Sequence, residues 1–439
     1  MASFGSKAAG TGMSAPKTIA PQSRARGCLE LTGSYGFSKT VAAGFLACGA
    51  RSGQVIGARR QRRVAQAPKL RFVTRVWRSE SDEPAPARLT EVDDRLKADE
   101  ALRRVKRGEY LLYTGDFHNA RQLLQAMGRR LEAPSRAKSA LQAFREERQA
   151  RLLEHETLSR VVVSLDPDYR LGLRRAPDVR QACREVWGDS RGETTHVALK
   201  TLLGMIGAAQ WRQKGLQVPG LKGTLRPHYG VFTPTRTEYV ELLTHVPQPR
   251  LAGARVFDIG TGSGVLAFVL LQRGAASAVG TDLDPRAVEC AQSNARALGL
   301  EKRFTAMETD LFPDGKADLV VCNPPWIPEP PKNRIDRAVY DEDGAMLRRF
   351  LTELPRHLTR GGEGLLLLSD LPVLLGLRPA EWLDAELASA GLTVAWKKST
   401  SAHHTKAKVR LDQLHSTRAR EVTTLYGLVP SRAGTAPGP

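Results

Sequence analysis

The sequence of 439 residues is poor in cysteine, in long apolar runs and, near its start, in acidic residues. Its five cysteines include no Cys-x-x-Cys pair, which argues against a disulfide framework and a zinc site. We therefore expect no metal and a reducing compartment. No apolar run approaches the ~20 residues that span a bilayer, so no membrane partner is expected. The length allows two or three domains, and an apolar content of 41% supports a packed core.

Acidic residues are nearly absent from the first 79 residues, which hold fourteen of the 66 Lys and Arg residues but only one of the 46 acids. Most of the net charge of +20 belongs to this segment, so the remainder is only mildly basic, unlike a uniformly basic nucleic-acid-binding protein. Residues 1–85 are rich in Ala, Gly, Ser and Arg, which predicts a disordered basic leader. The alternatives are an organelle transit peptide and an extension that results from a misassigned start codon, and without a transit peptide we expect a cytoplasmic protein.

The next region, residues 86–224, is predicted to be a helical N-terminal domain, because apolar residues recur at helical spacing. The expected helices span 91–107, 119–131, 135–153 and 194–206. This region holds no cluster of catalytic residue types, so a cap or a substrate-positioning role is the plainest interpretation.

Residues 225–430 differ in character, because strand-like runs alternate with helical runs up to a tail, 431–439, that we expect to be disordered. Such alternation predicts an α/β domain, a Rossmann-like parallel sheet with helices on both faces. In open sheets of this kind the ligand lies beyond the carboxyl ends of the strands. The residues that fall at such ends are Asp258, Asp282, Asp310 and Asn323.

The glycine-rich segment Asp258-Ile-Gly-Thr-Gly-Ser-Gly264 joins a strand to a helix. Its three glycines allow a tight turn and a close approach of backbone amides to a ligand. This pattern alone is weak evidence, since a NAD-binding fold and a simple tight turn use much the same sequence. We assign Asp258, Gly260, Thr261, Gly262 and Gly264 to a nucleoside cofactor, with Asp258 placed to accept from its ammonium group.

Two further carboxylates follow at strand ends. Asp282 lies 18 residues after Gly264, a distance at which an acid can hold two ribose hydroxyls. Asp284 and Pro285 instead suit the N-cap and first position of the next helix. Asp310 and Leu311 end the third strand and are candidates for contact with an adenine amino group, although Asp310 also suits a solvated loop.

The sharpest signal is Asn323-Pro-Pro-Trp326, which follows the strand 318–322. Two successive prolines fix the backbone and remove two donors. The Asn323 side-chain oxygen and the Pro324 carbonyl can then accept from one planar NH2 group and direct its lone pair outward. The indole of Trp326 offers a face for stacking. Asn323, Pro324, Pro325 and Trp326 are therefore the candidate catalytic residues, and Asn323 is also expected to border the cofactor.

Together these segments resemble class I S-adenosylmethionine-dependent methyltransferases of the Asn-Pro-Pro-Tyr/Trp type. The resemblance covers residues 225–430 and is greatest to the glutamine methyltransferases of peptide-chain release factors. Supporting fragments are Phe232-Thr-Pro-Thr-Arg-Thr-Glu238, Asp310-Leu-Phe-Pro-Asp314 and Tyr340-Asp-Glu-Asp-Gly344. The resemblance implies a seven-stranded sheet with a reversed last strand, a helical N-terminal domain, S-adenosyl-L-methionine as cofactor, and an acceptor site at 323–326.

The acceptor stays open at this point. It is either a glutamine amide of a protein of the translation machinery, or an exocyclic amine of a base in ribosomal or transfer RNA. The basic leader and the stretch 397–410 would favour RNA. A DNA adenine methyltransferase is disfavoured, because only 113 residues follow Trp326 and leave little room for target recognition. A non-catalytic nucleic-acid-binding protein that kept the fold is another alternative, and the Asn-Pro-Pro-Trp segment argues against a NAD-dependent oxidoreductase.

Overall fold

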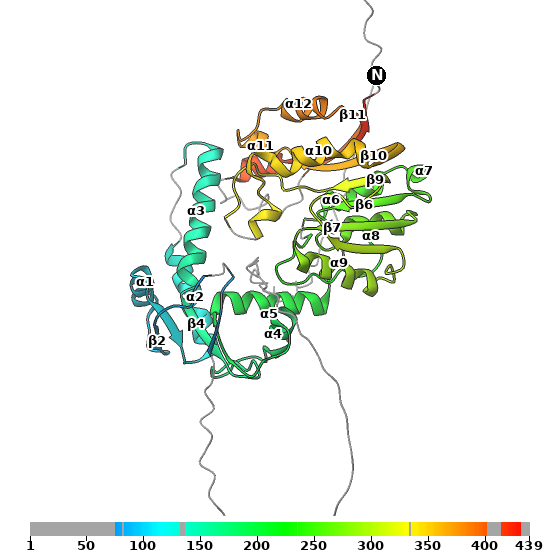
Figure 1. The fold of residues 1–439 in the computed structure, drawn as a ribbon. Helices are drawn as coiled ribbons and strands as arrows, with labels where there is room; N and C mark the ends of the chain where they lie inside the picture. Colours follow the sequence, from blue (N-terminus) through cyan, green and yellow to red (C-terminus); the bar gives the residue numbers. More distant parts are fainter. Residues whose placement is uncertain are drawn as a thin grey trace, which may run out of the picture. The chain divides into compact units, whose positions relative to one another are not determined.

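The computed structural model describes residues 75–80, 83–131, 137–234, 236–332, 335–401 and 414–431 (Figure 1). The leader up to residue 74, the part of the basic stretch from 402 to 410, and the tail from 432 onward lie outside the described residues. The predicted disorder of the leader and of the tail therefore stays a prediction.

Seven of the described strands form one sheet in the C-terminal part, in the order β11-β12-β10-β9-β6-β7-β8. Their bounds are β6 (Arg255–Ile259), β7 (Ser277–Asp282), β8 (Phe304–Glu308), β9 (Ala317–Cys322), β10 (Leu358–Ser369), β11 (Leu392–Ser401) and β12 (Val422–Pro430). Only β12 runs against its neighbours, pairing antiparallel with both β10 and β11, whereas the other strand pairs of this sheet are parallel. The seven-stranded sheet with a reversed last strand is thus confirmed.

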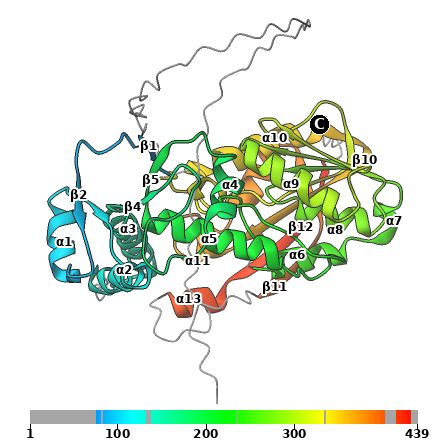
Figure 2. The same cartoon turned by 90° about the horizontal axis from the view of Figure 1, so that it is seen from below.

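Helices cover both faces of this sheet (Figures 1 and 2). Their bounds are α6 (Glu238–Leu242), α7 (Gln248–Leu251), α8 (Val265–Gln272), α9 (Pro285–Ala297), α10 (Ala345–His357), α11 (Leu371–Leu374), α12 (Trp382–Ser389) and α13 (His415–Arg420), with short 3-10 turns at Leu243–His245, Ile335–Ala338 and Glu342–Gly344. Along β6, Val256 packs in the core cluster that includes α8 and α9, while its neighbour Phe257 packs in the cluster that includes α10. This alternation follows from the two-residue period of a strand and gives the sheet a core on each side.

Local sequence explains the start of α9 and the burial of α8. The Asp284 side chain accepts from the amide of Arg286 and Pro285 takes the first helical position, so α9 starts as the sequence predicts. Seven of the eight residues of α8 are buried, which matches its uninterrupted apolar sequence.

The N-terminal part corrects the sequence prediction, because residues 86–224 are not all-helical. The described strands there form a five-stranded mixed sheet in the order β1-β5-β4-β3-β2, with helices packed against it. The strands are β1 (Arg75–Arg78), β2 (Leu89–Val92), β3 (Tyr110–Tyr113), β4 (Val161–Leu165) and β5 (Thr194–Ala198), and the helices are α1 (Ala98–Lys106), α2 (Phe117–Leu131), α3 (Ala140–Leu158), α4 (Arg180–Trp187) and α5 (Leu199–Lys214). Strand β1 also lies inside the segment 1–85 that was predicted to be a disordered leader, and it pairs with β5.

The error has a physical cause. These strands are four or five residues long, and a short apolar run fits the buried face of a helix as well as a strand. The expected helix 194–206 combined strand β5 with the first turns of α5, and 91–107 combined the end of β2 with α1. The β-branched run Val161 to Val163 was the available strand signal.

Within the described residues, no helix is long and apolar enough to cross a membrane. Across the same part of the chain, no group of three or more His, Cys, Asp or Glu side chains is arranged to hold a metal ion.

Candidate active site

Strand register brings the two sequence motifs to the same edge of the C-terminal sheet. Strands β6 and β9 are parallel neighbours, and Ile259 lies opposite Cys322. The glycine-rich loop therefore leaves its strand directly beside the point where Asn323 leaves the next one. Because both strands point the same way, both motifs emerge at their carboxyl ends, where ligands of open α/β sheets lie.

Asp258 is fully buried at the head of the glycine-rich loop. One carboxylate oxygen accepts from the Thr261 hydroxyl at 2.8 Å and from the Ala267 amide at 3.2 Å. The other oxygen, Oδ1, is buried without a hydrogen-bond partner. Burial raises the pKa of this carboxyl to about 6, although the two hydrogen bonds oppose the shift. A buried acceptor of this kind is costly unless a donor completes it.

The glycines of the loop are required by backbone conformation and by space. Gly260, Gly262 and Gly264 have positive φ values of 69°, 53° and 86°. A Cβ on Gly264 would come within 2.3 Å of the Phe268 ring, so no larger residue fits there. At Gly260 and Gly262 a Cβ would meet no atom within 4 Å, so this part of the loop borders open space. A ligand could therefore approach the main chain closely there.

Asp282 at the end of β7 is tied to the same loop. Its carboxylate accepts from the amides of Gly262 at 3.0 Å and Asp284 at 2.9 Å. Burial raises its pKa, against the effect of these two bonds. A carboxylate has about four lone-pair positions, so acceptor capacity remains for further donors. The next side chain, Leu283, is apolar yet 65% exposed, which is the property of a surface that a ligand can cover.

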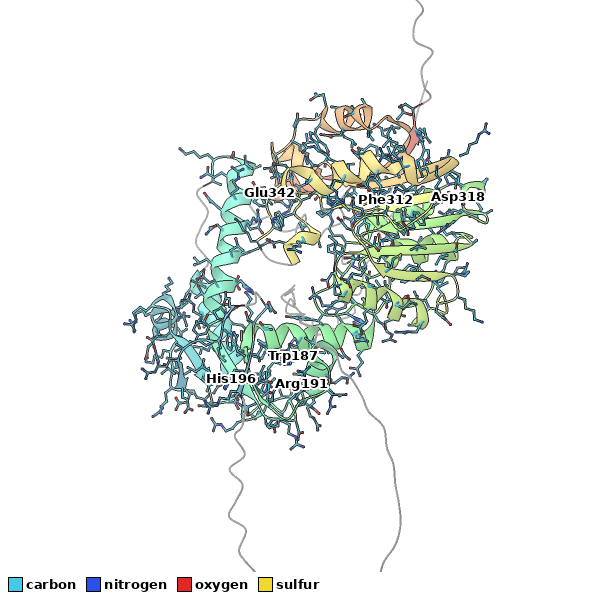
Figure 3. The ribbon with its side chains drawn as sticks, viewed as in Figure 1. Trp187, Arg191, His196, Phe312, Asp318 and Glu342 are labelled. Atoms are coloured by element: carbon cyan, nitrogen blue, oxygen red, sulfur yellow. The ribbon has the colours of Figure 1, made fainter. Side chains whose placement is uncertain are left out.

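The two candidate residues that follow β8, Asp310 and Leu311, differ in burial and in how firmly they are held. Asp310 lies at the surface and pairs with Arg349 of α10 at 2.9 Å, both side chains being about half exposed. Leu311 is buried with a positive φ of 64°, and its carbonyl accepts from the Thr281 hydroxyl. The following ring of Phe312, labelled in Figure 3, stacks on Phe350 of α10 at 5.6 Å. The main chain at Leu311 is thus fixed, whereas the Asp310 carboxylate is only loosely held.

The Asn-Pro-Pro-Trp segment is internally hydrogen-bonded. The indole Nε1 of Trp326 donates to Asn323 Oδ1 at 3.0 Å and to the Leu367 carbonyl of β10 at 3.3 Å. The Asn323 oxygen that sequence analysis assigned to an acceptor NH2 therefore already accepts one bond. An amide oxygen has two lone pairs, so one position remains, and the indole fixes its direction.

A buried ion cluster that sequence analysis missed lies against Trp326. The Arg236 guanidinium carbon is 5.2 Å from the centre of the Trp326 ring. Arg236 pairs with Glu238 at 2.7 Å and with Glu421 at 2.9 Å, and these two carboxylates are 1% and 2% exposed. Ser369 at the end of β10 donates to the same Glu421 oxygen at 2.6 Å.

The sequence pointed to two of the three charged residues of this cluster. Arg236 and Glu238 stood in a fragment that carried the family resemblance, and nothing local marked Glu421 as their partner. Strand β12 runs antiparallel to β10, with Thr423 opposite Ser369. Its first residues therefore meet the carboxyl end of β10, which brings Glu421 to the site.

These features fit an adenosine cofactor that ends in an ammonium group. The loop offers backbone amides beside open space, Asp282 retains acceptor positions for ribose hydroxyls, and Leu283 is an exposed apolar surface. The Oδ1 atom of Asp258 is a buried acceptor that lacks a donor. The residues present thus match the polar and apolar parts of such a ligand.

The known proteins to which this chain is similar are methyltransferases. The family model "Ribosomal protein L11 methyltransferase (PrmA)" matches residues 234–324. A "Putative protein N5-glutamine methyltransferase" of Methanocaldococcus jannaschii is 32% identical over 164 residues, which cover 36% of this chain and 80% of that protein. The release factor glutamine methyltransferase of Rhodospirillum rubrum is 39% identical over 141 residues, or 30% of this chain and 40% of that protein. The ribosomal protein L11 methyltransferase of Hahella chejuensis is 35% identical over 104 residues, or 24% and 36%.

The sheet order, the glycine-rich loop and the acid at the end of the second strand define a domain of the nucleoside-binding α/β class. The extent of the match to the archaeal protein fixes the family: the chain belongs to the class I S-adenosylmethionine-dependent methyltransferases, among the relatives of protein N5-glutamine methyltransferases.

Proposed function

We propose that this methyltransferase transfers the methyl group of S-adenosylmethionine to the side-chain nitrogen of a glutamine in a protein. The observation that carries the proposal is the position of Asn323 beside the glycine-rich loop, with its oxygen oriented by Trp326. Two relatives named for glutamine methylation match this region, one of them over 80% of its length. An exocyclic amine of an RNA base has the same planar NH2 geometry and is the outcome that the experiment below must separate.

The cofactor supplies an electrophilic methyl group when bound. In the proposed arrangement the Asp258 carboxylate receives its ammonium group and Asp282 receives the ribose hydroxyls. The apolar surface of Leu283 and the main chain at Leu311 border the adenine, with Asp310 at its amino group. Asp258 Oδ1, further acceptor positions of Asp282 and the surface of Leu283 are left available by the described side chains, whereas Asp310 would share its carboxylate with Arg349.

The acceptor amide is proposed to lie against one face of the Trp326 indole, within reach of Asn323 Oδ1. One N–H donates to the remaining lone pair of Asn323 Oδ1, and the other donates to the Pro324 carbonyl. Holding both hydrogens in the amide plane leaves the nitrogen lone pair perpendicular to that plane, toward the cofactor. The two oxygens also stabilise the positive charge that develops on nitrogen until it loses a proton. Pro325 keeps the backbone in this conformation.

Trp326 supplies the stacking surface in this proposal, and the ion cluster around Arg236 leaves only one face of the indole for the acceptor. Arg236 lies over one face of the ring, so the planar acceptor would stack on the opposite face. The cluster of one arginine and two carboxylates around Arg236 carries a net negative charge when all three are ionised. This charge favours a cationic nitrogen nearby over a neutral one.

A labelling experiment tests the proposal. The protein is incubated with S-adenosylmethionine carrying a tritiated methyl group and with a whole-cell extract, and the products are treated with protease or with ribonuclease. We expect label that only protease releases and that acid hydrolysis converts to methylamine, the product of an N-methylated glutamine amide. Asn323→Ala serves as the inactive control.

The other outcomes are equally informative. Label released only by ribonuclease would replace the glutamine amide with an RNA base. Calorimetry that detects no binding of S-adenosylmethionine would remove the proposal altogether.

A further inference from the structure

Helix α3 of the N-terminal part packs against the segment that directly follows the Asn-Pro-Pro-Trp motif, of which the structure describes residues 327–332 and 335–341 (Figure 1). Arg148 of the helix and Glu329 of the segment, which are in contact, lie 181 positions apart in the sequence. Two backbone hydrogen bonds tie the end of this segment back to its start, from the Ile327 amide to the Val339 carbonyl at 3.0 Å and from the Asp341 amide to the Ile327 carbonyl at 2.8 Å. Any displacement of the segment would therefore move Ile327, the residue next to Trp326.

Arg148 is the centre of the contact. Its guanidinium donates to Glu329 at 3.0 Å and to the Pro330 carbonyl, and lies 3.4 Å from the Asp336 carboxylate. The same group stacks over the Tyr340 ring, with 3.9 Å between the guanidinium carbon and the ring centre. The side chain of Arg148 is 11% exposed, and those of Glu329 and Asp336 are 15% and 18% exposed. One planar cation thus holds both ends of the segment, a geometry suited to arginine and not to lysine.

An apolar contact supports the ion pairs. Phe144, one turn before Arg148 on α3, packs with Ile327 in a small buried cluster that also contains Leu375 and Leu414. Its ring lies 6.5 Å from that of Tyr340. On the same helix Glu147 pairs with Arg418 of α13 at 2.6 Å. Helix α3 is therefore fixed to the elements around the motif and not to one loop alone.

We propose that Arg148 is a positioning residue for methyl transfer, an inference that rests on the function proposed above. It acts through residues 327–341 to hold Trp326 and Asn323 in the orientation that receives the acceptor. The N-terminal part would then belong to the acceptor-handling machinery, because one of its helices sets the geometry of the catalytic motif. Misplacing a reacting group by about 1 Å can cost about a hundredfold in rate, so modest loosening of this segment has a measurable effect.

The first test measures amide hydrogen exchange and requires no acceptor. In Arg148→Ala the amides of Ile327 and Asp341 should exchange about tenfold faster or more, because their segment has lost its main anchor. The amides of β6 should keep their wild-type rates. Arg151→Ala is the matched control, since Arg151 lies on the same helix, is 55% exposed, and pairs with Glu147 one turn earlier. Unchanged exchange at Ile327 and Asp341 would overturn the inference.

A second, milder variant tests the same contact if Arg148→Ala does not fold. Glu329→Gln keeps the shape of the side chain and removes its charge, so we expect the same local pattern of exchange with a smaller amplitude. Faster exchange in β6 as well as at Ile327, in either variant, would make Arg148 a residue for overall stability and would also contradict the inference.

The kinetic test separates this inference from the proposed function. In the assay with tritiated S-adenosylmethionine and whole-cell extract as the source of acceptor, Arg148→Ala should lower turnover about tenfold or more. The affinity for S-adenosylmethionine should stay unchanged. Wild-type turnover in Arg148→Ala would remove the positioning role and leave the proposed function intact. Absence of cofactor binding by the wild-type protein would remove the proposed function, while the exchange result would still report on the contact.

Discussion

The side of the sheet proposed to bind the cofactor and the side proposed to bind the acceptor are built from contacts of very different range. On the cofactor side, Asp258 bonds to residues three and nine positions later, and Asp282 bonds to Gly262, twenty positions earlier. On the acceptor side, Trp326 reaches Leu367, 41 positions away, and Arg236 reaches Glu421, 185 positions away. The first is one β-loop-α-β unit, whereas the second joins residues from distant parts of the chain.

The difference implies that the two sides respond differently to substitution. A local loop is held by its own turn and by the strands that flank it, so a changed side chain there mainly alters ligand binding. A site assembled from distant residues depends on buried polar contacts whose loss also costs stability. Three substitutions and one pH titration test this contrast, from the largest expected effect to the smallest.

The largest effect is expected at Arg236. Arg236→Met keeps the apolar stem and removes the charge, leaving Glu238 and Glu421 buried without their cation. Breaking a buried pair in this way costs about 3–5 kcal/mol. Chemical denaturation should therefore show a decrease of this size in the free energy of unfolding. Arg349→Met is the matched control, because its pair with Asp310 is about half exposed and should contribute less than about 1 kcal/mol. Equal effects in the two variants would erase the contrast between buried and exposed pairs.

Asn323→Ala should follow, with an effect on turnover and not on cofactor binding. Loss of one well-placed polar group at a developing charge typically lowers turnover by about 10²–10³. We expect that range in the labelling assay, together with wild-type affinity for S-adenosylmethionine by calorimetry. A collapse of cofactor affinity would show that Asn323 serves the cofactor side, contrary to the role assigned here.

Asp282→Ala should have the opposite signature. Hydrogen bonds to a charged group contribute about 1.5–3 kcal/mol, so cofactor affinity should fall about 10- to 150-fold. Turnover at saturating cofactor should change much less. Asp310→Ala provides the comparison, since its exposed carboxylate is loosely held and its removal should weaken binding by a smaller factor. If Asp310→Ala proved the more damaging of the two, the adenine and ribose assignments would need to be exchanged.

The smallest effect is a pH dependence of cofactor binding. Burial raises the pKa of Asp258 to about 6, and Asp282 is shifted in the same direction. A bound ammonium group favours the ionised carboxylate and lowers its pKa, so binding releases a proton and strengthens as pH rises through about 6. At pH 5 about nine-tenths of Asp258 is protonated, so affinity should be about tenfold lower than above pH 7.

Calorimetry of S-adenosylhomocysteine between pH 5 and pH 8 measures this dependence. Methylthioadenosine, which lacks the ammonium group, should show a weaker dependence over the same range. An identical profile for the two ligands would contradict the contact between Asp258 and the ammonium group.

Sequence reasoning succeeded where the physical signal was local. The tight turn at Gly260 to Gly264, the acid at the end of β7 and the N-cap at Asp284 each follow from a few neighbouring residues. The alternation of strands and helices predicted an α/β sheet for a related reason, since each element carries its own periodicity, whereas the number of seven strands came from the family resemblance.

Sequence reasoning failed where pairing between distant parts of the chain decides the structure. Strands β3 and β5 are too short to show a two-residue period, and only pairing within a five-stranded sheet makes them strands. The direction of the Asn323 oxygen was also beyond reach, because it depends on a bond from Trp326 whose indole is in turn anchored on β10.

The amino-acid sequence by itself determined the class of this protein, because the glycine-rich turn and the rigid Asn-Pro-Pro-Trp corner are each encoded by adjacent residues. Only the tertiary structure decided what surrounds that corner: Arg236 and Glu421 against the indole, and Arg148 of α3 on the segment that follows it. The physical reason is that a buried charge needs a partner in space, and chain topology, not sequence proximity, selects that partner.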